Sequence, residues 1–381
     1  MQGSVRKKNK QSWEITIDVG RDENGKRLRK YFHVTGTKAE AQRELRRLLT
    51  QLDKGLPVDD SKVATGEFLE RWLSDYAEIR TAQRTVDGYR GIIERYLKPE
   101  LGNVLLAKLK PQHIQKLYSS MMGKGLSART ILHTHRVLSN ALKNAVKWGL
   151  LVRNVCDAVD PPRPRRKQMN VLDEADISKF LDAIGKSRYG PVFFLMLYTG
   201  LRRGETLGLR WCDVDLKSDP KTISVNKSVV RLKNKGIVVT EPKTPYSRRL
   251  VTLPESAAAL LRGLHAKQME ERSEAGVQWD EKNFVFPHPD GGPLSPDTIT
   301  HAFIKIIRRK GLPKVRLHDL RHTHATWMIK AGTNPKVVSE RLGHSSITIT
   351  MDTYSHVLPG MQKEAAIAFE EAIQDVIKQP V

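Results

Sequence analysis

A proline-rich basic segment, Asp160-Pro161-Pro162-Arg163-Pro164-Arg165-Arg166-Lys167, divides this chain into two stretches of different character. Proline fixes φ and lacks a backbone N–H, so a helix cannot continue through the segment and the chain is stiffened there. Before it, residues 63–160 have helical periodicity throughout, whereas from residue 171 helical and strand-like patterns alternate. The segment therefore predicts a linker over residues 161–170 between a helical domain and a mixed one.

The helical stretch contains several helix signals. Apolar residues recur at i, i+1, i+4, i+5 and i+8 from Phe68 to Tyr76, which predicts a helix with a wide apolar face. Start and stop residues predict three more helices, one from Thr85 through Tyr96, one from Pro111 to about Gly123, and one capped by Ser127 that runs through Trp148. By composition alone, any helical bundle satisfies these signals.

Residues 1–57 read as a small basic module. The segment 13–19 alternates apolar and polar residues like a strand, residues 22–25 form a turn signal, and residues 27–34 can return as the next strand. Thr37 is placed to cap a helix from Lys38 to about Leu52. The module is expected to be a short sheet with one helix.

Residues 171–381 predict a mixed α+β domain. Asp173 caps a helix to about Gly185, and helices are expected over 189–198 and from about 203. Strand-like segments cover 222–229, 236–241 and 248–253, and helices return at 255–273, 296–310, 318–331, 335–342, 346–351 and 360 to about 378. The whole chain is thus expected to be multidomain and mainly α, with small antiparallel β-sheets.

The charge of the chain points to a polyanionic partner. Lys and Arg number 65 against 42 Asp and Glu among the 381 residues, which gives a formal net charge of +23. A surplus of this size most often serves nucleic acid binding, although some ribosome-associated or membrane-peripheral proteins share it. Two basic sets are candidate DNA contacts: one face of the predicted return strand and the linker. They comprise Arg27, Arg29 and His33, and Arg163, Arg165, Arg166 and Lys167. A generic α+β cap and a solvated hinge are the alternatives.

The cysteines and the apolar segments indicate the cellular compartment in which the protein is expected. Cys156 and Cys212 lie far apart in no paired motif, which argues against a disulfide framework and a cysteine-based zinc site. The first residues lack the apolar core of a signal peptide, and no stretch approaches the length of a membrane span. We expect a cytoplasmic, nucleoid-associated protein without a membrane partner.

Five short strings in the C-terminal domain carry a coherent chemistry. They are Thr199-Gly200-Leu201-Arg202-Arg203-Gly204-Glu205, Pro242-Lys243-Thr244, Leu317-His318-Asp319-Leu320-Arg321-His322-Thr323, Leu342-Gly343-His344 and Asp352-Thr353-Tyr354. A phenol, two guanidiniums, two imidazoles and an ammonium can hold a phosphodiester, stabilise the charge that builds on it, and exchange one ester bond for another. Each string alone is weak, because most tyrosines are packing residues and Arg202 with Glu205 fits a plain i,i+3 ion pair.

These strings, in this order, resemble the tyrosine recombinase (phage integrase) family, strongly in the C-terminal half and by layout elsewhere. The resemblance implies an arm-type DNA-binding module at 1–57, a SAM-like core-binding domain at 63–160 and a catalytic domain at 171–381. It implies that Arg202, Arg321 and His344 stabilise the phosphate, that His318 is the base and Lys243 the acid, and that Tyr354 forms a 3′-phosphotyrosine bond. Glu205 is expected to orient Arg202.

The resemblance also implies partners and reaction. The expected function is site-specific recombination by a homotetramer on double-stranded DNA, through a Holliday junction, at core-type and arm-type sites. Accessory DNA-bending or directionality proteins are possible partners, and no cofactor, metal or ATP is expected. An inactive DNA-binding protein of the same fold and a type IB topoisomerase are the alternatives.

Three points stay open in the sequence. Lys221, Lys233 and Lys235 compete with Lys243 for the role of the acid. His318, His322 and His324 cluster like metal ligands, but Asp319 stands where a zinc-protease motif needs Glu, so His322 and His324 are interpreted as packing or supporting groups. The apolar face of the last helix can pack on its own domain or on a neighbouring protomer.

Overall fold

The computed structural model describes residues 3–9, 11–21, 27–53, 63–165, 169–232, 235–241, 248–276, 280, 283–354 and six residues of the tail. The chain separates into two compact units, residues 1–166 and 167–381. The predicted turn at 22–25, most of the predicted last helix, Lys243, Arg166 and Lys167 lie outside the described residues.

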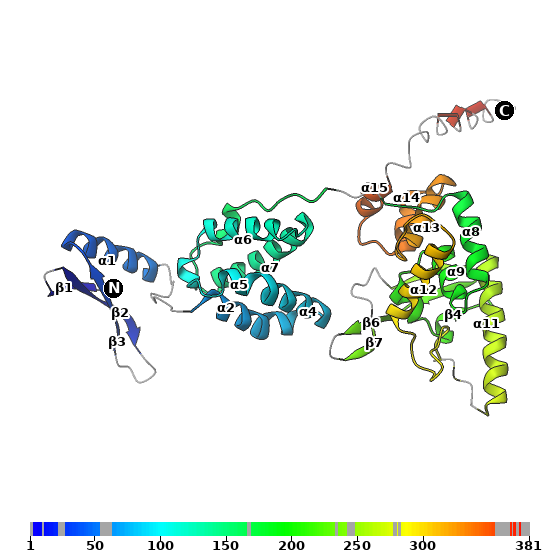
Figure 1. Cartoon of the computed structure of the whole chain (residues 1–381), viewed down its shortest axis with the longest axis horizontal. Helices are drawn as coiled ribbons and strands as arrows, with labels where there is room; N and C mark the ends of the chain where they lie inside the picture. Colours follow the sequence, from blue (N-terminus) through cyan, green and yellow to red (C-terminus); the bar gives the residue numbers. More distant parts are fainter. Residues whose placement is uncertain are drawn as a thin grey trace, which may run out of the picture. The chain divides into compact units, whose positions relative to one another are not determined.

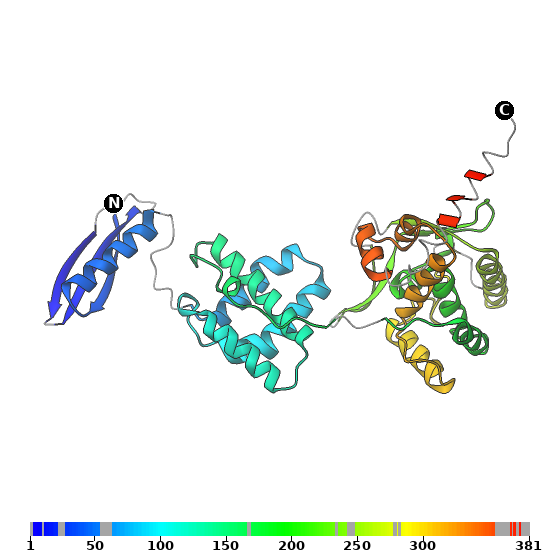
Figure 2. The ribbon, with the colours of Figure 1, turned by 90° about the horizontal axis from the view of Figure 1, so that it is seen from above.

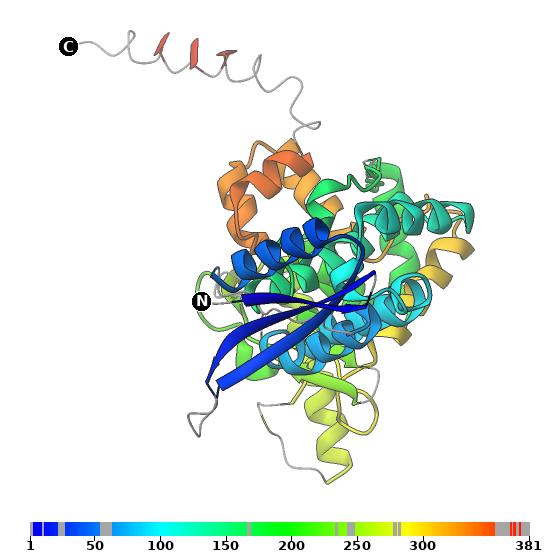
Figure 3. The same ribbon diagram turned by 90° about the vertical axis from the view of Figure 1, so that its left-hand side faces the viewer.

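The N-terminal module is a three-stranded antiparallel sheet with one helix across one face (Figure 2 and Figure 3). Its strands are β1 (Gly3–Asn9), β2 (Ser12–Arg21) and β3 (Arg27–Thr35), and its helix is α1 (Lys38–Asp53). Ile15, Ile17 and Leu48 are buried between sheet and helix. The sequence predicted β2, β3 and α1 but not β1, whose single apolar residue, Val5, gives almost no alternation. Pairing with β2 from Gly3↔Ile17 onward makes this polar segment a strand.

Residues 63–160 are helical, as expected, and two of their helices contain a π turn. The elements are α2 (Thr65–Trp72), η1 (Leu73–Ala77), α3 (Glu78–Arg80), α4 (Gln83–Ile92), η2 (Ile93–Leu97), α5 (Lys98–Leu101), η3 (Leu106–Lys108), α6 (Pro111–Gly123), α7 (Ala128–Lys147) and η4 (Val155–Ala158). The predictions for α6 and α7 are confirmed, and Ser127 caps α7 by accepting from the Thr130 N–H. The second predicted helix was too short, because it begins at Gln83 without a side-chain cap and continues through the π turn to Leu101.

The second unit is built around α9 (Gly190–Thr199), an almost wholly apolar helix (Figure 1). The helices packed around it are α8 (Glu174–Gly185), α10 (Arg203–Leu207), α11 (Glu255–Glu274) and α13 (Asp319–Lys330). The others are η5 (Trp211–Asp213), α12 (Pro296–Arg309), α14 (Pro335–Leu342) and α15 (Ile347–Tyr354). A second, smaller apolar cluster of Ala325, Ile329, Val338, Leu342 and Tyr354 joins α13, α14 and α15.

Two small antiparallel sheets lie in this unit. One has the order β4 (Val214–Asp215), β5 (Thr222–Val225), β8 (Arg249–Thr252), and the other pairs β6 (Ser228–Leu232) with β7 (Gly236–Thr240). The single strand expected over 222–229 is wrong, because the chain leaves one sheet after Val225 and enters the other at Ser228. Asn226, between them, donates to Asp213 at 3.0 Å, which fixes this change of direction.

In the described part of the tail, residues 366–367, 369–370 and 373–374 are helical. Ile367, Phe369 and Ile373 among them are exposed. No helix among the described residues combines the length and the apolarity that crossing a membrane requires.

Candidate active site

Arg202 is placed by the turn between α9 and α10. Gly200 ends α9 in the left-handed conformation, with φ of 68°. A Cβ at this glycine would lie 2.7 Å from side-chain carbons of both His324 and Leu342, so only glycine lets the turn approach α13 and α14. Arg202 is the N-cap of α10, and Glu205 accepts its backbone N–H at 2.9 Å and its Nη1 at 2.7 Å.

Glu205 is a buried carboxylate that two arginines share. Arg249 Nη2, at the start of β8, donates to Oε2 of Glu205 at 2.9 Å, while Arg202 Nη1 holds Oε1. Burial opposes ionisation of Glu205, but the charge and hydrogen bonds of Arg249, followed by those of Arg202, bring its pKa below the ordinary value. Glu205 is therefore an anion that orients both guanidiniums.

Arg321 lies on the first turn of α13 and is only 2% exposed. Its Nη1 donates to the Gly200 carbonyl at 2.8 Å, and its Nη2 donates to the Leu342 carbonyl. Burial and the neighbouring charge of Arg202 lower the pKa of Arg321 to about 9, so the side chain remains a cation at neutral pH. The guanidinium is thereby fixed between the ends of α9 and α14.

Two histidines lie beside these arginines. His318 is the N-cap of α13, and partial burial followed by the charges of Arg321 and Arg202 lowers its pKa. His344 follows Gly343, which ends α14 with φ of 65°, and its Nδ1 is 2.8 Å from the Thr350 hydroxyl. Burial, then the same two arginines, lowers the pKa of His344 to about 4, so its imidazole is neutral at pH 7.

A cavity of about 550 Å³ joins these groups into one site. Arg202, His318, Arg321 and His344 line it, together with residues of β6, β7 and α15. A cavity with two cationic forks and two imidazoles can bind a phosphate oxygen at several points at once. Four of the six predicted catalytic residues are therefore brought together, although they come from segments over 140 residues apart.

Tyr354, the last residue of α15, is buried to 1% exposure in the cluster of Val338 and Leu342. Its hydroxyl is 2.7 Å from Nδ1 of His322, whose ring packs edge-on against that of His318. Burial raises the pKa of Tyr354 to about 12, and burial followed by the charge of His318 lowers the pKa of His322 to about 4. The phenol is therefore protonated and paired with a neutral imidazole that itself lines the cavity.

The predicted DNA contacts that the structure describes belong to the N-terminal module and the linker. Arg29 and His33 are exposed on the outer face of β3, and the backbone of Arg27 belongs to the same strand. Arg163 and Arg165 are exposed in the linker.

Sequence reasoning missed Arg249 and did not reveal which residue His322 supports. Arg249 carries no recognisable motif, because one arginine of the Arg248-Arg249 pair before a strand looks like surface charge. His322 was interpreted as a supporting group, but its bond to Tyr354 depends on α15 folding against α13, which spacing cannot reveal. His324 is half-buried, with Nδ1 2.9 Å from the Leu197 carbonyl, and Arg341 donates to its Nε2 at 3.1 Å. Within the described residues, no three His, Cys, Asp or Glu side chains gather as metal ligands would.

Comparisons with known proteins identify the family of this chain. The model of the phage integrase family matches residues 170–361, and that of the phage integrase N-terminal SAM-like domain matches residues 66–122. A tyrosine recombinase XerC-like protein of Caldanaerobacter subterraneus subsp. tengcongensis is 32% identical over 375 residues, which are 94% of this chain and 96% of that protein.

Two solved structures share the fold. The Tn1549 transposon integrase in complex with transposon right end DNA has a TM-score of 0.68 at 22% identity, covering 80% of this chain and 99% of that one. A lambda integrase tetramer bound to a Holliday junction has a TM-score of 0.55 at 18% identity, covering 90% of this chain and 96% of that one.

Proposed function

Because the chain belongs to the phage integrase family of tyrosine recombinases, we propose that the cavity lined by Arg202, His318, Arg321 and His344 is where it cuts and rejoins DNA. The protein is a site-specific DNA recombinase of the phage or mobile-element type. The observation that supports this location most strongly is the convergence of Arg202 and Arg321 on the C-terminal turn of α14, directly before His344. Two fixed cations and an imidazole then face the same volume.

The arginines stabilise the negative charge that develops on the scissile phosphate. The attacked phosphorus gathers negative charge on its non-bridging oxygens, and guanidinium forks match two such oxygens and stay protonated. Arg202 and Arg321 hold them, and His344 adds a hydrogen bond. His318 lies at the N-terminus of α13, where the helix dipole also favours an anion. Each such donor is worth roughly 3–4 kcal/mol of transition-state stabilisation.

Tyr354 is the nucleophile, and it must leave its resting position to act. Its hydroxyl attacks the scissile phosphorus, the O–H proton passes to His318, and the bond from phosphorus to the 5′-oxygen breaks. The product is a 3′-phosphotyrosine ester, whose bond energy is preserved for rejoining. Since the hydroxyl is hydrogen-bonded to His322 and the Tyr354 side chain is buried, DNA binding must turn the phenol toward the phosphate.

The leaving 5′-oxygen needs a proton, which we assign to Lys243. This residue lies in the connection 242–247 between β7 and β8, outside the described residues. Thr240 and Glu241, immediately before that connection, line the cavity, which brings the chain to its edge.

The remaining units are proposed to bind DNA around this site. Residues 63–160 and the basic linker with Arg163, Arg165, Arg166 and Lys167 would clasp the core-type site, and the face of β3 with Arg27, Arg29 and His33 would bind arm-type DNA. Four protomers would exchange strands through a Holliday junction on the bacterial nucleoid, with accessory DNA-bending proteins as possible partners. The exposed Ile367, Phe369 and Ile373 favour docking of the tail on a neighbouring protomer.

The decisive experiment traps the covalent intermediate. A core duplex is built on the direct repeat that flanks the integrated element, with a nick that lets the cleaved end diffuse away. Wild-type protein is expected to accumulate a protein–DNA adduct, while Tyr354→Phe forms none and binds the duplex as tightly. An adduct formed by the Phe variant would show that another residue is the nucleophile. Relaxation of plasmids that lack the repeat would instead favour a topoisomerase.

A further inference from the structure

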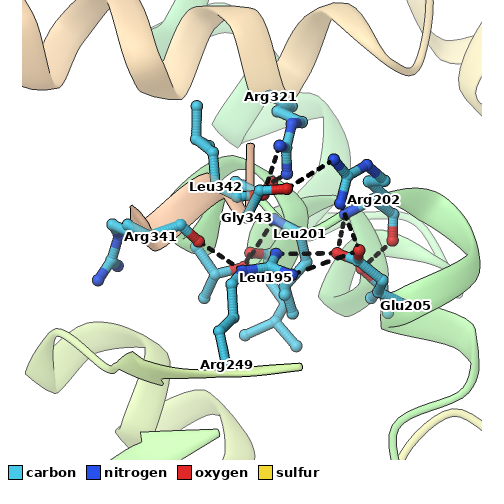
Figure 4. Close-up of polar contacts among 12 residues, drawn as sticks. Leu195, Leu201, Arg202, Glu205, Arg249, Arg321, Arg341, Leu342 and Gly343 are labelled. Atoms are coloured by element: carbon cyan, nitrogen blue, oxygen red, sulfur yellow. Dashed lines mark hydrogen bonds and ion pairs between the residues drawn. The ribbon is translucent and has the colours of Figure 1, made fainter. Parts of the chain in front are cut away.

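Three consecutive backbone carbonyls at the end of α14 each accept a hydrogen bond from a different arginine (Figure 4). Arg249 Nε donates to the Arg341 carbonyl at 2.6 Å, Arg321 Nη2 to that of Leu342, and Arg202 Nη2 to that of Gly343 at 3.2 Å. These carbonyls form the negative end of the α14 dipole, so three cations are suited to it. Two of the arginines are the proposed phosphate ligands, and the third, Arg249, is unassigned.

Arg249 differs from the other two arginines in its burial and in its pairing with Glu205. Its side chain is 7% exposed, against 37% for Arg202, and its guanidinium forks onto Glu205, which is 5% exposed. The contacts are Nη2 to Oε2 at 2.9 Å and Nη1 to Oε1 at 3.4 Å. Arg202 and Glu205 both line the cavity, whereas Arg249 is not among its lining residues and contacts Glu205 from the buried side.

The charge balance explains why a second arginine is needed. The charges of Arg202 and Glu205 alone would sum to zero. A buried carboxylate whose only partner is one guanidinium would also occupy both hydrogen-bonding edges of that guanidinium. With Arg249 present, the three side chains sum to one positive charge. Arg202 then contributes a single Nη to Glu205 and another to Gly343, and its charge is left to act on a phosphate in the cavity.

We propose that Arg249 is a positioning residue for strand cleavage, which acts without touching DNA by neutralising Glu205 and holding the end of α14, so that Arg202 presents its charge to the scissile phosphate. This inference rests on the proposed function of the cavity. It assigns Arg249 to the step that builds charge on phosphorus and not to DNA affinity, because the side chain is buried away from the surface that a duplex would meet.

The test uses the full chain and the nicked core duplex, with Arg249→Lys, Arg249→Met and a matched control, Arg262→Met. Arg262 pairs with Glu255 on the exposed face of α11 and takes no part in the cavity. Arg249→Lys keeps the cation but cannot reach Glu205 and the Arg341 carbonyl together. It is expected to bind the duplex within threefold of wild type and to form the adduct about 10²-fold more slowly. The control is expected to match wild type.

A charge rescue separates positioning from simple loss of folding. In Arg249→Met, Glu205 is left with Arg202 alone, so adding Glu205→Gln removes the anion that captures Arg202. The double variant is expected to form the adduct about tenfold faster than Arg249→Met. Wild-type rates in Arg249→Lys, or a double variant slower than Arg249→Met, would overturn the inference. If Arg249→Met does not fold, the Lys variant alone decides. Absence of an adduct with wild-type protein would instead reject the proposed function.

Discussion

Replacing Arg321 by methionine separates the stability of this site from its chemistry. Methionine keeps an unbranched apolar chain at this position but removes the guanidinium, with its charge and all its donors. Burial, followed by the charge of Arg202, lowers the pKa of Arg321 to about 9, so holding the cation in the folded protein costs about 5 kcal/mol. Because the pKa of this base is depressed in the fold, the cost applies in full below about pH 9 and decreases only at higher pH, where the folded side chain loses its proton. Removing the charge at neutral pH therefore returns that amount to the folded state.

The opposing effect is the loss of two hydrogen bonds. The Gly200 and Leu342 carbonyls each lose a donor, and an unsatisfied buried acceptor costs roughly 1–3 kcal/mol, or about 2–6 kcal/mol for the two. The effects nearly cancel, so the free energy of unfolding is expected to change by less than about 3 kcal/mol. Adduct formation has no such compensation and is expected to fall by roughly 10²–10³-fold.

Native-state hydrogen exchange of α13 and α14 amides under increasing urea measures the stability change, and the nicked core duplex measures cleavage. A loss of more than about 5 kcal/mol would show that Arg321 is mainly a structural pin between α9 and α14, against the balance given above. Cleavage within tenfold of wild type would show that it does not hold the phosphate.

Three further outcomes are expected. Gly200→Ala should destabilise the second unit by about 1–3 kcal/mol more than Gly332→Ala, because both glycines have positive φ but only the former meets side chains, and equal urea midpoints would contradict this. His322 and His344 are neutral in the fold, with pKa values of about 4. The contribution of each to the free energy of unfolding is therefore constant above pH 6.5 and falls by up to about 3 kcal/mol as the pH drops toward 4. A urea midpoint that stays constant from pH 7 to 4.5 would contradict this. Arg29→Ala should weaken binding to arm-type duplex and lower its salt slope by about 1 without slowing cleavage of core duplex, whereas an unchanged slope would exclude a phosphate contact there.

Local signals in the sequence were enough for elements that depend on their own residues. Ser127 begins α7 and Asp173 begins α8 because each side chain accepts the backbone N–H three residues on, which a sequence displays directly. The alternation of β2 and β3 likewise reflects one buried face. By contrast, β1 and the division between β5 and β6 depend on which strand is available as a partner, and no local pattern encodes that choice.

The candidate site was predictable to the extent that its chemistry resides in short strings. Gly200 and Arg202 could be found because the left-handed turn and the arginine are neighbours in the chain. Arg249 could not, since its importance arises from Glu205, 44 residues away, and from a carbonyl 92 residues away. The contact of Tyr354 with His322 depends in the same way on tertiary packing.

The carbonyls at the end of α14 have a consequence for how the recombinase is made. Arg202 is synthesised 141 residues before the group it binds there, and Arg249 92 residues before its own. A polypeptide that ends before α14, either on the ribosome or by truncation, therefore contains Arg202 and Arg249 but lacks the α14 carbonyls that orient them. It also lacks Tyr354. On the proposed function, a chain truncated ahead of α14 is therefore expected to bind DNA without cutting it.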